Sequence, residues 1–157
     1  MRRAAERGIT LLTVHGDGDI IRAAVEGRTD SSLKILAISA LTSLNDAGLR
    51  ELGHQKTVAE LIRDRVMNCI AWGCDGVIAS PDDVADIRGL AGAEQLLVVT
   101  PGVRLAGTGL DDHKRSGTPA QAIAAGADYL VIGRPIVRAD DPAAMAARII
   151  ADMQGAT

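Results

Sequence analysis

The sequence predicts an α/β protein built on a parallel sheet, and three observations support this fold class. Five short apolar runs alternate with stretches that have the 3.6-residue period of amphipathic helices. The runs are apolar at consecutive positions, as strands are when both faces of their sheet are covered. Strands that alternate with helices along a chain form parallel sheets. Since no linker or low-complexity segment interrupts the 157 residues, we expect a single domain over residues 1–157.

The five strands are predicted where apolar residues cluster between turn signals. The first run contains Ile9 and Val14, and the last begins at Tyr129. Such runs are too short for helices that cross a domain, and their ends carry Gly, Ser, Thr or Asp. The predicted strands are residues 9–14, 34–39, 76–79, 96–100 and 129–132.

Helices are predicted between and after these strands. Thr57 and Glu60 form the pattern of a capping box, and Gly73 follows the end of that helix. Its apolar residues recur at helical spacing, at Val58, Leu61, Ile62, Val66, Cys69 and Ile70. Another short helix is predicted over residues 20–25, and further helices open at Pro81, Pro119 and Pro142, where proline suits the first helical position.

The composition excludes several classes of function. Aromatic residues make up 1% of the chain and the net charge is −3, which argues against a nucleic-acid surface. No apolar run of about 18 residues predicts a membrane span, and no apolar signal core follows the basic start, so we expect a cytoplasmic protein. Cys69 and Cys74 lack the spacing of metal motifs, and we expect two reduced thiols and no metal site.

The ends of the last two strands carry the strongest chemical signal. Residues 100–104 read Thr-Pro-Gly-Val-Arg, and Gly133-Arg134 follows the final strand. Glycine lets the backbone approach a ligand, and arginine supplies a forked cation for phosphate. Two consecutive strands ending this way are typical of the phosphate site after strands 7 and 8 of a (β/α)8 barrel. A complete barrel needs at least about 200 residues, so the sequence predicts only part of one.

An ordered series of motifs along nearly the whole chain resembles the orotidine 5′-phosphate decarboxylase family. The resemblance implies that the predicted strands are barrel strands 4 to 8 with their helices, the C-terminal part of a TIM barrel. The motifs are Thr13-Val14-His15, Leu41-Thr42-Ser43, Asp75-Gly76-Val77, Thr100 to Arg104, Asp112 to Arg115, Thr118-Pro119, Gly126 to Tyr129 and Gly133 to Ile136.

The family's catalytic signature, Asp-x-Lys-x-x-Asp, is absent from the chain. Asp112-His113-Lys114 is only a superficial match, because residue 117 is glycine and the segment falls after the seventh barrel strand. No catalytic residue is therefore assigned. The resemblance implies decarboxylation of orotidine 5′-monophosphate to UMP without a cofactor, in an enzyme that forms a homodimer. We expect the isolated chain to be inactive.

The resemblance also implies a set of substrate-binding residues. Gly133 and Arg134 correspond to the phosphate-binding pair, and Arg104 to the arginine at the base of a mobile loop, predicted over residues 105–117. Thr42 corresponds to a threonine that contacts the nucleotide, and His113 stands where the family usually has glutamine. Each could instead be an ordinary loop or turn residue.

Two other functions remain open from the sequence. The chain could be a non-catalytic fragment that binds phosphate, or a related barrel acting on a sugar phosphate, such as a hexulose-phosphate synthase. In either case five strands cannot close a barrel. The first and last strands would then present free edges, and we expect aggregation or an oligomer.

Overall fold

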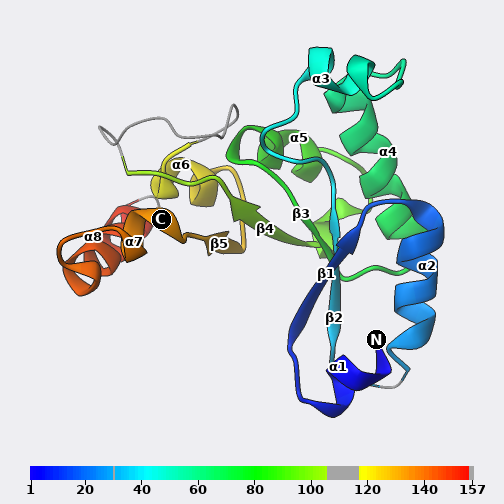
Figure 1. Ribbon diagram of the computed structural model, residues 1–157, viewed down its shortest axis with the longest axis horizontal. Coiled ribbons are helices and arrows are strands. Elements are labelled where there is room, and N and C mark those ends of the chain that lie inside the picture. The colour runs from blue at the N-terminus through cyan, green and yellow to red at the C-terminus, as the bar shows by residue number, and fades with distance from the viewer. Residues whose placement is uncertain (30, 106–116, 156–157) are drawn as a thin grey trace.

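The sheet confirms the predicted fold class. The computed structural model describes residues 1–29, 31–105 and 117–155, and its five strands form one parallel sheet in the order β1-β2-β3-β4-β5 (Figure 1). The predicted strands are confirmed with ends that shift by at most two residues. The strands are β1 (Leu11–His15), β2 (Lys34–Ile38), β3 (Gly76–Ile78), β4 (Leu97–Pro101) and β5 (Tyr129–Val131).

Every neighbouring pair of strands is parallel, so their carboxyl ends meet at one end of the sheet. His15 is the register partner of Ile38, and Pro101 is the partner of Val131. A residue that follows β4 therefore lies beside one that follows β5. This register is what brings loops distant in sequence into one place.

The predicted helices are present, and several short ones were not anticipated. The helix predicted over residues 20–25 extends in the structure beyond both predicted ends. The helix expected at Pro81 divides into a 3-10 turn and a short α-helix. The helices missed from the sequence are α1, α3 and α7. The helical elements are α1 (Arg2–Glu6), α2 (Gly18–Gly27), α3 (Asp46–Glu51), α4 (Val58–Ala71), η1 (Pro81–Asp83), α5 (Val84–Arg88), η2 (Ala93–Gln95), α6 (Pro119–Ala124), α7 (Arg134–Val137) and α8 (Pro142–Gln154).

Capping side chains fix where the helices start. Thr57 accepts a hydrogen bond from the backbone N–H of Glu60, whose carboxylate accepts one from the Thr57 N–H at 2.8 Å. That bond holds the pKa of Glu60 below its usual value. Thr118 and Gln121 form the same reciprocal box at α6. Each box satisfies backbone donors that the first helical turn leaves unpaired.

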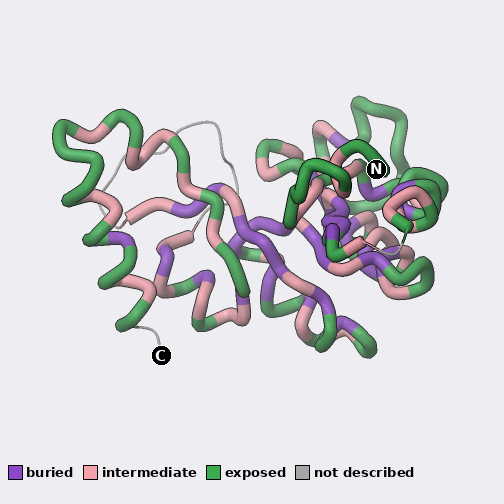
Figure 2. The backbone as a smooth tube through the Cα atoms, turned by 90° about the horizontal axis from the view of Figure 1, so that it is seen from below, coloured by how far each residue is buried: buried purple, intermediate pink, exposed green. Residues whose placement is uncertain are grey.

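The hydrophobic core lies between one face of the sheet and the helices. α2 and α4 run side by side against β1 to β3, while α6 packs on α8 beyond β4 (Figure 1). Alternate strand residues such as Ile35, Val77 and Val98 are fully buried in this core. Figure 2 shows the buried residues concentrated along the central strands, while β5, α7 and α8 are mostly exposed or half-buried.

The other face of the sheet carries the remaining strand residues. At its centre Leu36 and Val99 are buried, but towards the edge strands Thr13, Tyr129 and Val131 are exposed. No helix covers this inner face among the described residues, and the alternation of strand side chains places these residues on it. The inner face is the side that would point into a barrel.

The amino ends of the strands are held by two carboxylates. Asp75 accepts hydrogen bonds from the Ile35 backbone N–H at 2.9 Å and from Lys34 Nζ at 3.1 Å, and it forms an ion pair with Arg28. In the same way, Asp128 accepts from the Val98 backbone N–H at 2.7 Å. Each carboxylate therefore ties the strand it precedes to the previous one.

Arg88, on α5, completes the second of these clamps. Its guanidinium donates to Asp128 at 2.7 Å and to the carbonyl oxygens of Gly126 at 2.8 and 2.9 Å and of Leu96 at 2.8 Å. Gly126 has a φ of +106°, and an added Cβ there would lie 3.1 Å from Arg88 Cγ. The arginine thus packs against a turn that requires glycine.

Cys69 lies in α4 and Cys74 just after it, and both are buried free thiols, as predicted. A hydrogen bond with Cys74 and burial raise the pKa of the Cys69 thiol. In the described part of the chain, no cluster of three or more metal-ligating side chains occurs, and no helix is long and apolar enough to cross a membrane.

Candidate functional site

The predicted binding residues gather at the carboxyl end of the sheet. Thr42 follows β2, Arg104 follows β4, and Gly133 and Arg134 follow β5. The end of β4 pairs with the end of β5, so the two arginines leave the sheet from adjacent strands. In parallel α/β folds this end of the strands is where ligands bind.

A cavity of about 260 Å³ opens at this end, on the inner face of the sheet. Thr42 lines it together with Pro101 and Val131, the last residues of β4 and β5. The cavity therefore links the predicted nucleotide contact to the two strands that carry the phosphate-binding residues. Its full lining is Thr13, Ile38, Ala40, Leu41, Thr42, Ile78, Pro101 and Val131.

Arg104 is held at the base of the segment that was predicted to be mobile. Its backbone N–H donates to the Gly117 carbonyl at 2.9 Å, and Val103 forms an isolated parallel bridge with Gly117. Gly102 has a φ of +79°, which turns the chain sharply after β4. Residues 106–116, and with them the predicted contact His113, lie outside the described residues.

Gly133 leaves space above the backbone where β5 ends. Among the described residues, no heavy atom lies within 4 Å of the position that an added Cβ would take, and Gly133 is exposed. Packing within the chain therefore does not explain the glycine. Arg134 is the first residue of α7, and Gly133 accepts the backbone N–H groups of Ile136 at 3.0 Å and Val137 at 3.1 Å. The open space is suited to close approach of a ligand.

Arg65 is a residue at this end that sequence reasoning missed. From α4 it donates to the Ser39 carbonyl at 3.0 Å and forms an ion pair with Asp17 at 3.1 Å. It thus joins the loops after β1 and β2. The sequence did contain a sign that Arg65 faces the core and not the solvent. It lies three residues after Ile62 and four before Cys69, on the buried face of α4.

Three other titratable side chains, those of His15, Lys34 and Lys56, do not line the cavity. His15 ends β1 and is exposed, and it does not line the cavity beside it. Lys34 lies at the opposite, amino end of β2 in its ion pair with Asp75, and Lys56 pairs with Asp64, which raises the pKa of Lys56. The described lysines therefore stand away from the cavity.

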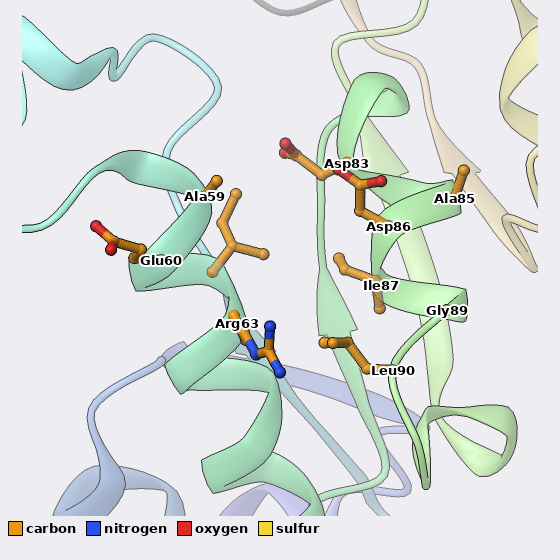
Figure 3. A pocket seen from close by; sticks show the side chains of 10 residues that line it. Ala59, Glu60, Arg63, Asp83, Ala85, Asp86, Ile87, Gly89 and Leu90 are labelled. Atoms are coloured by element: carbon orange, nitrogen blue, oxygen red, sulfur yellow. The ribbon is translucent and has the colours of Figure 1, made fainter.

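A second hollow, of about 450 Å³, lies between α4 and α5 on the helical side of the sheet (Figure 3). Figure 3 shows the Arg63 side chain on α4 directed toward the side of Ile87 and Leu90, whereas the Glu60 carboxylate points away from them. None of the predicted substrate-binding residues lines this groove. The groove is separate from the carboxyl end of the sheet that the motifs single out.

A parallel α/β unit with glycine and arginine after its last two strands defines a class: part of a (β/α) barrel. Comparison with known proteins identifies the family. Residues 1–149 match the family "Orotidine 5'-phosphate decarboxylase / HUMPS family". The chain belongs to this family, which confirms the resemblance drawn from its motifs.

Curated relatives support the same assignment. The chain is 45% identical over 157 residues to orotidine 5′-phosphate decarboxylase of Caulobacter vibrioides (strain NA1000 / CB15N), covering 98% of this chain and 67% of the relative. It is 49% identical over 159 residues to the enzyme of that name from Ruegeria pomeroyi, covering 96% and 65%. The chain therefore spans about two thirds of the length of these relatives.

Solved structures agree in fold. The crystal structure of orotidine 5′-phosphate decarboxylase from Lactobacillus acidophilus superposes with a TM-score of 0.79 at 32% identity, over 97% of this chain and 66% of that one. The Sulfolobus solfataricus enzyme of the same name matches with a TM-score of 0.66 at 17% identity, which supports the fold alone. The sheet described here is thus part of a TIM barrel.

Proposed function

We propose that this chain supplies the nucleotide-binding part of an orotidine 5′-monophosphate decarboxylase, an enzyme that forms UMP and carbon dioxide. The observation that carries the proposal is the placement of Arg104 and of Gly133-Arg134 after adjacent strands of a family member. The curated relatives at 45 and 49% identity are named for this activity.

The chemistry of the carboxyl end fits a nucleoside monophosphate. Guanidinium groups bind phosphate with charge-assisted, often bidentate, hydrogen bonds. In the proposal, Arg134 and the Gly133 backbone bind the phosphate, and Arg104 closes on it from the neighbouring strand. Thr42, across the cavity, offers a hydroxyl to the nucleoside. His113 is proposed to bridge phosphate and pyrimidine.

Binding of the phosphate is proposed to accelerate the reaction, although the phosphate is remote from the reacting carbon. Interactions with a non-reacting part of a substrate can lower the barrier at the reacting carbon when they drive closure of the site. The proposal assigns residues 105–117 as the segment that closes. It assigns no cofactor to the reaction, following the family resemblance.

The proton-handling step is proposed to need groups that this chain lacks. The resemblance assigns it to the alternating Asp and Lys residues of Asp-x-Lys-x-x-Asp, which the sequence does not contain. Lys34 and Lys56 are engaged by Asp75 and Asp64 away from the cavity. Purified chain incubated with orotidine 5′-monophosphate should release no carbon dioxide above background, and turnover that survives removal of contaminating enzyme would contradict this.

The proposal also covers the oligomeric state and the cellular location of the enzyme. The family resemblance favours a homodimer and a cytoplasmic location in pyrimidine synthesis.

Titration calorimetry with UMP tests the binding proposal. Arg134→Ala should weaken UMP binding about 10- to 100-fold, since hydrogen bonds to a charged group contribute about 1.5–3 kcal/mol. Arg138→Ala is the matched control, because Arg138 caps the other end of α7 and is exposed. Equal UMP affinity in the wild-type chain and both variants would place the nucleotide elsewhere.

A further inference from the structure

The two cysteines of the chain come together where α4 ends. In the Schellman motif that closes the helix, the Cys74 backbone N–H donates to the Cys69 carbonyl at 2.9 Å. The Gly73 N–H donates to the Ile70 carbonyl at 3.3 Å, and Gly73 has the left-handed φ of +67° that this motif needs. Side chains at the two outer positions of the motif commonly contact each other, and here both are thiols.

The same hydrogen bond limits the separation of the two Cα atoms. Standard covalent geometry places Cys69 Cα about 2.4 Å from its carbonyl oxygen and Cys74 Cα about 1.5 Å from its nitrogen. Even with every atom in one line, the 2.9 Å hydrogen bond leaves the Cα atoms at most about 6.8 Å apart. Disulfide bonds span Cα separations of about 4.4 to 6.8 Å. The backbone therefore holds the two cysteines within the range of a disulfide.

The two thiols also interact directly. A hydrogen bond between them lowers the pKa of Cys74 and raises the pKa of Cys69. The Cys74 thiol in turn donates to the Ile35 carbonyl at 3.1 Å. The thiolate is the reactive form of cysteine, so Cys74 is the better nucleophile of the pair.

The turn next to the pair lies at the surface. Cys69 is fully buried, whereas Cys74 keeps 6% of its surface exposed. Trp72 and Gly73, which directly precede Cys74, are both exposed. Helix ends open locally at low cost, and opening of this turn uncovers Cys74 before Cys69.

We propose that Cys69 and Cys74 form a reversible redox site, at which a low-molecular-weight disulfide such as oxidised glutathione converts the two thiols into an intrachain disulfide. The site lies at the amino end of the sheet, beside Asp75, and neither cysteine lines the cavity at the carboxyl end. The inference goes beyond the proposed nucleotide site and does not depend on it.

The reaction consists of two thiol–disulfide exchanges. Cys74 loses its proton, and its thiolate attacks one sulfur of oxidised glutathione, which forms a mixed disulfide and releases one glutathione thiolate. Cys69 then loses its proton and attacks the Cys74 sulfur, which forms the intrachain bond and releases the second glutathione thiolate. Two electrons pass from the protein to oxidised glutathione, and the two protons convert the released thiolates to reduced glutathione.

Equilibration in glutathione buffers tests the site. Free thiols are trapped with a maleimide, and the tryptic peptide of residues 66–88, which contains both cysteines, is analysed by mass spectrometry. The intrachain disulfide appears as an unlabelled peptide that has lost two hydrogen atoms. The ratio of disulfide to dithiol should be at least tenfold higher in the native chain than in chain unfolded by urea, because the folded turn holds the two residues together.

The stability of the wild-type chain gives a second readout that needs no variant. A disulfide that fits the native turn constrains the unfolded chain, so the oxidised chain should have a higher urea midpoint than the reduced chain. The affinity for UMP should be the same in both forms, since the site is remote from the cavity.

Single-cysteine variants separate the roles of the two thiols. Cys69→Ala should accumulate the mixed disulfide of Cys74 with glutathione. Cys74→Ala should stay largely unmodified, because Cys69 is fully buried. Circular dichroism checks that each variant is folded.

Three results would overturn the inference. The first is a native chain that keeps both thiols free in buffers that oxidise the unfolded chain, as inert core residues would. The second is a lower urea midpoint after oxidation, which would show that the disulfide does not fit the turn. The third is equal modification of Cys69→Ala and Cys74→Ala by glutathione.

Discussion

The two ends of the sheet are built differently. At the amino end, the carboxylates of Asp75 and Asp128 each receive a backbone N–H from the preceding strand and pair with an arginine. At the carboxyl end, the strands finish in loops around a cavity, and no described residue lies within 4 Å of where a Cβ on Gly133 would be. Carboxylate hydrogen bonds tie neighbouring strands together at the amino end, whereas a cavity lies among the loops at the carboxyl end.

The difference predicts that residues important for stability and residues important for binding lie at opposite ends of the sheet. A carboxylate that accepts several hydrogen bonds is costly to remove, because its donors are then left unpaired, and the cost is greater for the largely buried Asp75 than for the exposed Asp128. Residues around an open cavity cost little to change unless a ligand is present. Substitutions at the amino end should therefore lower the free energy of unfolding without changing UMP affinity, and those at the carboxyl end should do the reverse.

The largest loss of stability is expected for Arg88→Ala. This change leaves Asp128 and the carbonyls of Gly126 and Leu96 without their shared donor, and it should lower the free energy of unfolding by about 3 kcal/mol. Urea denaturation measures the loss. Arg63→Ala, at an exposed position on α4, should change stability by less than about 0.5 kcal/mol. Similar losses of stability in both variants would show that the hydrogen bonds of Arg88 do not stabilise the fold.

A smaller loss is expected for Asp75→Asn. The amide keeps the shape and can still accept from the Ile35 N–H, but it loses the charge that pairs with Arg28 and Lys34. The expected decrease in the free energy of unfolding is about 2 kcal/mol, with UMP affinity within a factor of two of wild type. A large fall in UMP affinity at unchanged stability would show that this end takes part in binding.

Thr118→Ala sharpens the comparison, because Thr118 lies towards the carboxyl end but has a structural role. Its hydroxyl accepts the Gln121 N–H at 3.1 Å as the cap of α6. Loss of such a cap costs about 1 kcal/mol. Thermal denaturation should show the decrease, and Thr118→Ser, which keeps the hydroxyl, should restore most of it. No recovery in the serine variant would indicate a packing effect instead.

The smallest effect on stability is expected for Gly133→Val. In the part of the chain that the structure describes, no heavy atom lies within 4 Å of the position that Cβ would take, so the free energy of unfolding should change by less than about 1 kcal/mol. The added side chain would nevertheless occupy the space proposed for phosphate, and UMP affinity should fall at least tenfold. Unchanged affinity would mean that the phosphate does not approach this backbone.

The sequence was sufficient for the sheet and for most helices, because these depend on local patterns. The run Leu97 to Pro101 and the box of Thr57 and Glu60 are visible without any tertiary contact. The helix α7 was missed, because four residues that begin with Arg-Pro carry no periodicity. The helix predicted to open at Pro81 begins as a 3-10 turn and continues as only five α-helical residues.

The candidate site could be predicted only where a residue is part of a motif. Arg104 and Arg134 follow strand ends in recognisable strings, and the structure places both after adjacent strands. Arg65 and Arg88 make contacts with residues 26 to 48 positions away in the chain, namely Ser39, Asp17, Gly126 and Asp128. Side chains that join distant loops leave no spacing pattern, so their roles required the structure.

Hydrogen exchange with and without UMP, followed by mass spectrometry, tests the central claim most directly. The method reports on each end of the sheet separately and tolerates an oligomeric chain. UMP should slow exchange in peptides covering residues 101–105 and 133–137, and leave those covering residues 75–76 and 127–128 unchanged. Protection confined to the amino end, or to the groove between α4 and α5, would contradict the assignment of the nucleotide site.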